Sequence, residues 1–523
     1  MRTMFSLAIE SADSTDGISG AGTAPVDNNA GLLEGALEDH DGMVQTSDSV
    51  DELIDGQEKL EEVVDVASES FSEGGLSKRG LAILKLTVKN IVGKNLANRS
   101  LPAMESYGIT HPMQVTAIAL EGINDTIKQF WQAIKNQMGK FWNQTKSWYL
   151  KTFDVANKII ARAKALDEKA NTLTTTPTEK SFEMGGASLL AVDYQVKDPA
   201  ALLTGLNNMK AILDGSLDTL TKDNQARKSE ALLTTSKNLL ARLRSAQTKA
   251  ESGVSITPEE KKGLDEAVNP DPNVYTVDNL VKAPVTEEGM KKKLGLDDQT
   301  LAFMSASLPG NRKLFRTEPA NTNSQTTTVA EITEALKRSR HFLGESAEKP
   351  REMEDSADVK TLNSSQIGQI ASVVGDMGET ILKYKKEFEA RDKFTSSVVK
   401  GFDQIIKELD GTEVEHPSDK KPAPPPSTTT NPAPAQPTPA PNPQGGGNGQ
   451  ASTTQQADGD EGDAANLKKP NEGVDKDIRR LANAFMQMFK KQISLSGAII
   501  THSVKVCNVY LTYGERSLAQ YGK

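Results

Sequence analysis

Large apolar residues recur every three or four positions between Val115 and Leu166, and this spacing predicts one long amphipathic helix. Thr110 is placed to cap this helix, and Pro112 falls in its first turn, where the missing N–H of proline costs nothing. If the helix continues to about Asn171, it is ~90 Å long at a rise of about 1.5 Å per residue. Three tryptophans lie along it: Trp131, Trp142 and Trp148.

Similar stripes predict further helices on both sides of this one. Ser77 is placed as the N-cap of a basic helix that ends near Asn95. More helices are expected over residues 198–217, 224–251, 256–274, 329–342 and 362–409. Residues 181–196 are expected to form a small hairpin, and residues 303–318 a strand, a turn and a strand. The predicted fold class is therefore mainly α, with long amphipathic helices and a small β element.

The pattern weakens towards both ends of the chain. Residues 11–50 are rich in Gly, Ser, Asp and Asn, so we expect the acidic segment 1–75 to be disordered. Eleven of the 24 prolines lie within residues 417–443, which indicates a Pro/Gly-rich linker followed by a C-terminal helical module. The predicted division of the chain is 1–75, 76–171, 172–411, 412–474 and 475–523.

Charge divides the chain in a similar way. Residues 1–75 hold two basic residues against eighteen acidic ones, a net charge of −16, in a chain whose net charge is −10 (61 − 71). The remainder therefore sums to +6 (59 − 53). An acidic segment on a mildly cationic helical body indicates assembly and processing, because its removal would change the charge of the chain and hence its partners.

The sequence offers little chemistry. It contains no phosphate-binding loop, no nucleophile elbow and no Cys/His cluster, and its five histidines are scattered. Cys507 is expected to be a small core residue of a helix. No segment has the ~18 apolar residues that span a membrane, so we expect a soluble chain made in a cytoplasm. We therefore predict that the protein is not an enzyme and uses no cofactor or metal.

One short pattern does recur, namely a small or apolar residue two positions before a glutamate. Such triplets are also expected by chance in a chain rich in Ala, Leu and Glu. The functional interpretation is a set of endoprotease sites, favoured where the chain is disordered. The candidate cleavage positions are Glu10, Glu34, Glu38, Glu69 and Glu105, with Glu121 the weakest because it falls in a predicted helix.

The tryptophan-bearing helix allows two interpretations. In one, its apolar stripe packs on neighbouring helices, with the tryptophans as large anchors. In the other, the helix lies in a membrane interface, with the tryptophans at the acyl boundary and its lysines facing anionic headgroups. Those lysines are Lys128, Lys135, Lys140, Lys146 and Lys151, and Asp125 is the only acid between Ile123 and Lys151. The same charge could make sequence-blind contact with nucleic acid phosphates.

Several segments resemble a known family. They are Gly75-Leu76-Ser77, Leu101–Gly108, Gln114–Glu121, Ile127–Trp131 and the turn Leu308-Pro309-Gly310-Asn311. This combination resembles the internal head proteins of large tailed bacteriophages, also described as prohead core or as capsid and scaffold proteins. The resemblance covers roughly residues 75–320. Residues 416–523 are not part of it, and the terminal module could be a docking element on a flexible tether.

The resemblance implies a structural protein of the virion interior that is made in the host cytoplasm. In that family an acidic front segment serves prohead assembly and is removed by a prohead protease after a glutamate. The body then stays in the capsid with the DNA, and some members are ejected with it. The implied partners are other capsid and core proteins, the prohead protease, packaged DNA and a membrane during ejection. The alternatives are a membrane-active ejection protein and a helical scaffold protein unrelated to phage.

Overall fold

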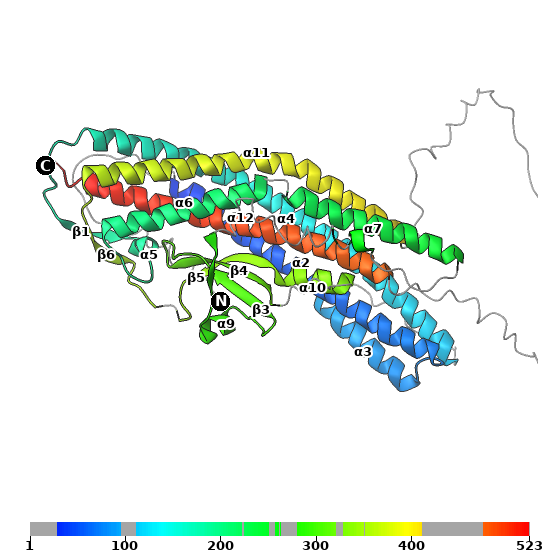
Figure 1. Ribbon diagram of the computed structural model, residues 1–523. Coiled ribbons are helices and arrows are strands. Elements are labelled where there is room, and N and C mark those ends of the chain that lie inside the picture. The colour runs from blue at the N-terminus through cyan, green and yellow to red at the C-terminus, as the bar shows by residue number, and fades with distance from the viewer. Residues whose placement is uncertain are drawn as a thin grey trace, which may run out of the picture.

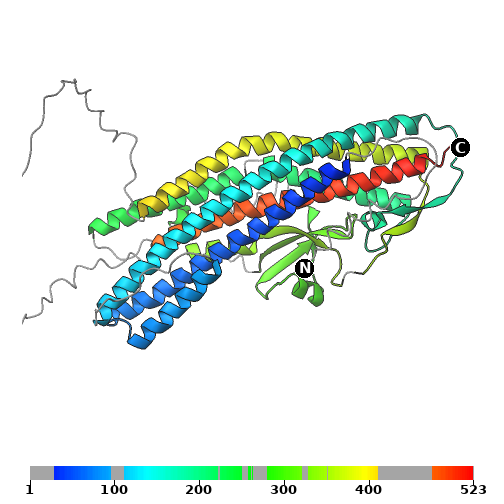
Figure 2. The same cartoon turned by 180° about the vertical axis from the view of Figure 1, so that it is seen from behind.

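The computed structural model describes residues 29–95, 111–221, 224–249, 257–260, 262, 280–320, 328–349, 351–409 and 474–521. Long helices lie side by side in an elongated bundle, and a small sheet covers part of one side (Figures 1 and 2). The long helices are α2 (Asn29–Ser72), α3 (Lys78–Asn95), α4 (Pro112–Asn171), α6 (Pro199–Thr221), α7 (Asn224–Lys249), α11 (Ser364–Leu409) and α12 (Val474–Leu518). The predicted mainly α class is therefore confirmed.

Helix α4 is the axis of the bundle. It is 60 residues long and ends at Asn171, as its periodicity predicts. Its N-cap is His111 rather than Thr110, which lies outside the described residues, and Pro112 occupies the first turn as expected. Its apolar side chains enter two large hydrophobic clusters, one packed with α6, α11 and α12 and the other with α2, α3 and α7.

The sheet confirms one β prediction. Strands β2 (Ala283–Pro284), β3 (Thr300–Met304), β4 (Arg312–Pro319) and β5 (Arg340–Glu345) form an antiparallel sheet in that order. The strand, turn and strand predicted over residues 303–318 correspond to β3, the turn that follows it and β4. Gly310 (φ +72°) and Asn311 (φ +56°) adopt the left-handed conformation that this turn needs.

The helix expected over residues 329–342 is shorter than predicted. It is α10 (Val329–Arg338), because β5 begins at Arg340 and pairs with β4. Thr328 caps α10 with a capping box that includes Glu331. The short helix α9 (Glu288–Lys293) lies beside this sheet. The helix expected over residues 256–274 falls mostly outside the described residues.

The predicted hairpin over residues 181–196 is wrong. Strand β1 (Ser181–Gly185) pairs with the distant strand β6 (Ser356–Lys360), in antiparallel register from Ser181 opposite Lys360. Gly186, at φ +74°, then turns the chain into the single-turn helix α5 (Ala187–Leu190). The apolar residues of the segment therefore pack in the main core instead of against one another.

Two larger corrections concern the ends of the chain. Residues 29–72 are not disordered, because they form helix α2, which packs along α4. The C-terminal helix α12 is not a separate module, because its side chains contribute to both large hydrophobic clusters. Residues 1–28 and most of the predicted linker, 412–474, lie outside the described residues, with only Val474 of the linker placed as the start of α12.

Candidate functional site: the seam between the acidic helix and the bundle

Three of the candidate cleavage glutamates lie on α2. Glu34 and Glu38 are exposed near its beginning, and Glu69 is exposed in its last turn. The residues beside them are buried: Ala36 and Ala67 are 4% and 1% exposed. These glutamates therefore sit on a packed helix and not on a free segment. Glu10 and Glu105 lie outside the described residues.

Helix α2 enters the bundle through a regular row of side chains, which we call the α2 seam. Its members are separated alternately by three and four positions, the repeat of a coiled coil. They are His40, Met43, Ser47, Val50, Ile54, Gln57, Glu61, Val64, Ser68 and Phe71, all of them buried or half-buried. Five of the ten are polar, which explains why an apolar stripe is hard to see in this part of the sequence.

The polar members of the α2 seam are incompletely satisfied. His40 Nε2, Gln57 Oε1, Glu61 Oε2 and Ser68 Oγ are buried and have no hydrogen-bond partner among the described residues. On α12 the same holds for both amide atoms of Asn483, for Nε2 of Gln492 and for the hydroxyls of Ser494, Thr501 and Ser503. An unsatisfied buried polar atom costs ~1–3 kcal/mol. The contact of α2 is therefore less stable than an all-apolar one of the same length.

Acidic residues of α2 face basic residues of α12 along an antiparallel row. Asp65 pairs with Lys476, and Asp51 pairs with Lys490. Lys490 is 2% exposed and also donates to the carbonyl oxygen of Ser47 over 2.9 Å.

Lysines of two more elements form ion pairs with acids of α2. From α10, Lys337 pairs with Glu58 at 2.5 Å, and from α4, Lys151 pairs with Asp39 at 2.8 Å. The acidic charge noted in the sequence is thus partly neutralised inside the fold.

Burial shifts the pKa values of charged groups in this region. Desolvation raises the pKa of the Glu61 carboxyl to about 7, against the opposing effect of the nearby Arg479. Desolvation lowers the pKa of Lys491 to about 8, although the Asp51 carboxylate favours its charged form. Lys491 donates to the carbonyl oxygen of Lys337 over 2.8 Å. We therefore expect the stability of the α2 contact to change with pH near neutrality.

A family model described as phiKZ-like phage internal head proteins matches residues 33–423, well over half of the chain. The chain belongs to this family. The comparisons with curated proteins and with solved structures found no match. The resemblance noted over residues 75–320 is therefore confirmed, and the alternative of a scaffold protein unrelated to phage is wrong.

The range matched by the family model treats the two ends of this internal head protein differently. It begins at residue 33, so it includes nearly all of α2 together with the bundle. It stops at residue 423, before α12, although α12 completes both hydrophobic clusters. Membership of the family places the protein inside the phage capsid.

The tryptophans of this internal head protein point into the bundle. Trp131 and Trp148 are 4% and 1% exposed, and the half-buried Trp142 stacks on Phe388 with 4.7 Å between ring centroids. Among the described residues no helix is long and apolar enough to cross a membrane. The tryptophans therefore act as packing anchors of the folded chain, as the first interpretation of this helix expects.

The lysines of α4 do not form one free stripe. Lys135 pairs with Asp403 of α11, and Lys151 pairs with Asp39 of α2. Lys128 pairs with Asp125 one turn away on the same helix, and Lys140 is exposed. The folded protein thus uses part of this charge to hold α11 and α2 against α4.

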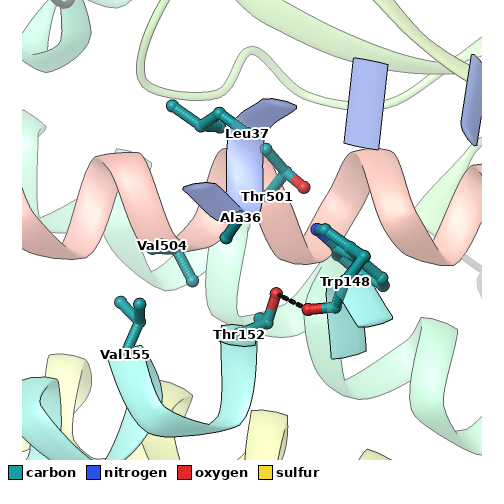
Figure 3. A pocket seen from close by; sticks show the side chains of 7 residues that line it. All are labelled: Ala36, Leu37, Trp148, Thr152, Val155, Thr501 and Val504. Atoms are coloured by element: carbon teal, nitrogen blue, oxygen red, sulfur yellow. Dashed lines mark hydrogen bonds between the residues drawn. The ribbon is translucent and has the colours of Figure 1, made fainter. Parts of the chain in front are cut away.

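Figure 3 shows a small pocket between the start of α2, α4 and α12. Ala36 and Leu37 of α2 lie above Trp148 and Val155 of α4, with Val504 of α12 beside them. The remaining gap is about 10 Å³, roughly the volume that one water centre occupies. The pocket at this end of α2 therefore has room for about one water molecule.

The described residues offer no obvious reactive centre. His502 and Cys507 are buried in α12, and desolvation raises the pKa of the Cys507 thiol to about 12. An open groove of about 440 Å³ between α6 and α11 is lined by both acids and lysines. Within it Asp214 accepts from Lys210 and Thr380, each at 2.7 Å. No group of metal-binding side chains occurs in the part of the chain that the structure describes.

The pairs that hold α2 were missed by sequence reasoning. The charged partners are hundreds of positions apart, as with Asp51 and Lys490, so no local pattern joins them. A signal for the helix itself was present in the alternating spacing from His40 to Phe71. That signal was hidden because half of the repeat positions are polar.

Proposed function

We propose that this internal head protein is a structural, non-catalytic component that assembles with other capsid and core proteins. In this proposal it is made in the host cytoplasm, trimmed by a prohead protease and retained with the packaged DNA. The observation that carries the proposal is the family match, which spans α2 and most of the bundle. The acidic helix with candidate glutamates at both ends supports the processing step.

Cleavage at these glutamates needs local opening, because proteases cut exposed, flexible chain. Helix ends open most readily, and Glu34, Glu38 and Glu69 all lie towards the ends of α2. At Glu69 the carbonyl oxygen accepts from the N–H of Glu73 at 3.2 Å and from the hydroxyl of Ser72 at 2.7 Å. The last turn must therefore unwind before the bond after Glu69 can be cut.

The position of the cut decides how the charge changes. Residues 1–34 hold five acids and one base, so a cut after Glu34 leaves a chain of −6 (−10 + 4). Residues 1–69 hold seventeen acids and two bases, so a cut after Glu69 leaves +5 (−10 + 15) if α2 also departs. Of these two cuts, the second alone reverses the sign of the charge. A cut after Glu34 trims the acidic end and leaves nearly all of α2 attached.

The test is the intact mass and N-terminal sequence of the chain from mature particles, compared with freshly made chain. We expect a new N-terminus directly after Glu34, Glu38 or Glu69, or after the other candidates Glu10 and Glu105. Changing the used glutamate to glutamine should block that cut. Asp55→Asn, which removes the same charge from an exposed position of α2, is the matched control. An uncut chain in mature particles would rule out processing.

Contact with packaged DNA is best supported by α3. This helix carries five basic residues and no acid, and Lys78, Arg79 and Lys89 are exposed. Each phosphate that a basic residue neutralises changes the slope of log K against log salt by about 0.9. A triple change of these residues to glutamate should therefore flatten the slope for duplex DNA by about 3. A single Lys140→Glu change on α4 should alter it much less, and equal slopes would argue against this surface.

A second candidate is contact with a membrane surface during ejection. The observation that favours it lies on α3 and not on the tryptophan helix, because Ile83 and Leu86 are 59% and 60% exposed beside the basic residues. Such a helix suits an anionic lipid surface. Sedimentation with anionic vesicles tests this, since Ile83→Ser with Leu86→Ser should weaken binding. Binding that is unchanged by both substitutions would remove this candidate.

A further inference from the structure

We infer that α2 is a docked ligand of its own bundle. In this inference the surface formed by α4 and α12 is a binding site for one acidic amphipathic helix. That site retains the helix after the chain has been cut in the last turn of α2 or between α2 and α3. The inference deepens the proposed function, because it states what a cut after Glu69 would do to the particle protein. It is carried by the contacts of α2 and does not require that the cut occurs in the phage.

The apolar part of the contact does not depend on the peptide link. Met43, Val50, Ile54 and Leu60 are 0% exposed, and they lie in the cluster formed with α4 and α12. The free energy of this burial is proportional to the apolar area removed from water, whether the helix is covalently attached or not. Severing the link would leave this area buried.

The link itself is short and contributes little packing. Ser72, Glu73 and Gly74 are exposed, and Gly74 has no other atom within 4 Å of the position a Cβ would take. Gly75 differs, because a Cβ there would come within 2.5 Å of the backbone of Pro112 and Met113. A cut at or before Gly74 therefore leaves the start of α3 and α4 undisturbed.

The charged part of the contact gives the site its preference for an acidic helix. Lys476 and Lys490 of α12 bind Asp65 and Asp51, while Lys337 of α10 binds Glu58. Removing the acidic helix would leave Lys490, now 2% exposed, without its carboxylate partner. The bundle without α2 is thus a cationic groove with an apolar floor.

The polar members of the α2 seam favour one alignment of α2 along the bundle. In coiled coils a polar residue at a core position selects one alignment at the expense of stability. Ser47, Gln57, Glu61 and Ser68 occupy such positions here, spread over most of the helix. Sliding α2 by one heptad would move each of these groups to a different place along the bundle and would separate Asp51 from Lys490. We therefore expect the cut helix to bind in the alignment seen in the intact chain.

Retention of the cut helix would also determine the net charge of the particle protein. A cut after Glu69 alone would not expose the cationic groove, because the acidic helix would stay in place and continue to neutralise it. The body would reach +5 only after a second step that removes the bound helix. Packaged DNA at high density is a polyanion that could compete for the groove in that step.

The experiment uses the full chain with a recognition sequence for a site-specific protease inserted after Gly74. After complete cutting, size exclusion and native mass spectrometry measure whether the N-terminal fragment remains with the body. At 0.15 M salt and about 1 µM protein we expect co-elution as a one-to-one complex, which requires a Kd below about 1 µM. Separate elution of the fragment, with the body folded or unfolded, would overturn the inference.

Charge variants test the row of ion pairs. Lys476→Glu replaces an attraction by a repulsion and should weaken retention about three- to tenfold. Adding Asp65→Lys to that variant should restore it. Lys128→Glu is the matched control, because Lys128 pairs within α4 and not with α2. Equal retention in the Lys476→Glu and Lys128→Glu proteins would overturn the electrostatic part. The particle N-terminus is measured separately, so failure here does not decide whether processing occurs.

Discussion

The imidazole of His502, on α12, donates from Nε2 to the carbonyl oxygen of Pro309 in the turn between β3 and β4, over 2.8 Å. A carbonyl oxygen only accepts, so this ring nitrogen carries its hydrogen. The pair joins the C-terminal helix to a turn that is 193 positions earlier in the chain. It shows that α12, which lies beyond the matched family range, is held by the segment that carries the family resemblance.

His502 should make the fold sensitive to acid. Burial lowers its pKa from 6.5 to about 4, so its contribution to stability is complete above pH 6.5 and is lost as the pH falls through 4. That contribution is at most about 3 kcal/mol. His502→Gln keeps a donor for the Pro309 carbonyl but does not titrate. Urea unfolding between pH 4 and 7 should show a smaller loss of stability in the variant, and parallel curves would contradict this assignment.

Glu61 should make the fold sensitive to alkaline pH, whereas His502 makes it sensitive to acid. Burial raises its pKa from 4.5 to about 7, so its contribution to stability is complete below pH 4.5 and is lost as the pH rises through 7. Glu61→Gln should therefore stabilise the protein at pH 8 by up to about 3 kcal/mol and change little at pH 4. The exposed neighbour Glu62 provides the control, since Glu62→Gln should have little effect at either pH. A Glu61→Gln protein no more stable than wild type at pH 8 would refute the prediction.

Trp148 should matter for stability far more than an exposed neighbour. It is 1% exposed and packs under the start of α2, so Trp148→Ala should destabilise the protein by about 3–5 kcal/mol. Leu150 is 62% exposed, and Leu150→Ala should change stability by less than about 0.5 kcal/mol. Guanidinium unfolding of both variants checks this. Equal, small effects would instead support a tryptophan that leaves the bundle to meet a membrane.

Two glycines with similar backbone conformations allow a matched test of the turn beside His502. Gly310 has φ +72°, and a Cβ there would approach His502 Cε1 to 2.8 Å. Gly295 has φ +66° with no atom within 4 Å of the position of its Cβ. Alanine at either site should cost about 1–2 kcal/mol for the left-handed backbone. Gly310→Ala should cost more because it also displaces His502, and thermal unfolding of the two variants measures the difference.

The sequence alone determined the elements whose signals are local. The period of apolar residues located α4 and α11, and Ser77 caps α3 as expected, with its hydroxyl accepting from the N–H of Gly80 at 3.1 Å. The turn residues Gly310 and Asn311 located the hairpin of β3 and β4. The family was also recognisable, because its motifs are short and contiguous. Periodicity, caps and turns depend on residues within a few positions of one another.

Only the tertiary structure decided the fate of the acidic segment, of residues 181–185 and of the C-terminal helix. Strand β1 needed a partner that lies far along the chain in β6. Helix α2 needed α4 and α12, because its row of side chains, which includes Ser47, Gln57 and Glu61, is buried by helices that lie far along the chain. The pairs of α2 with Lys476 and Lys490 join opposite ends of the chain. Such contacts are properties of the packed bundle, and no local sequence pattern encodes them.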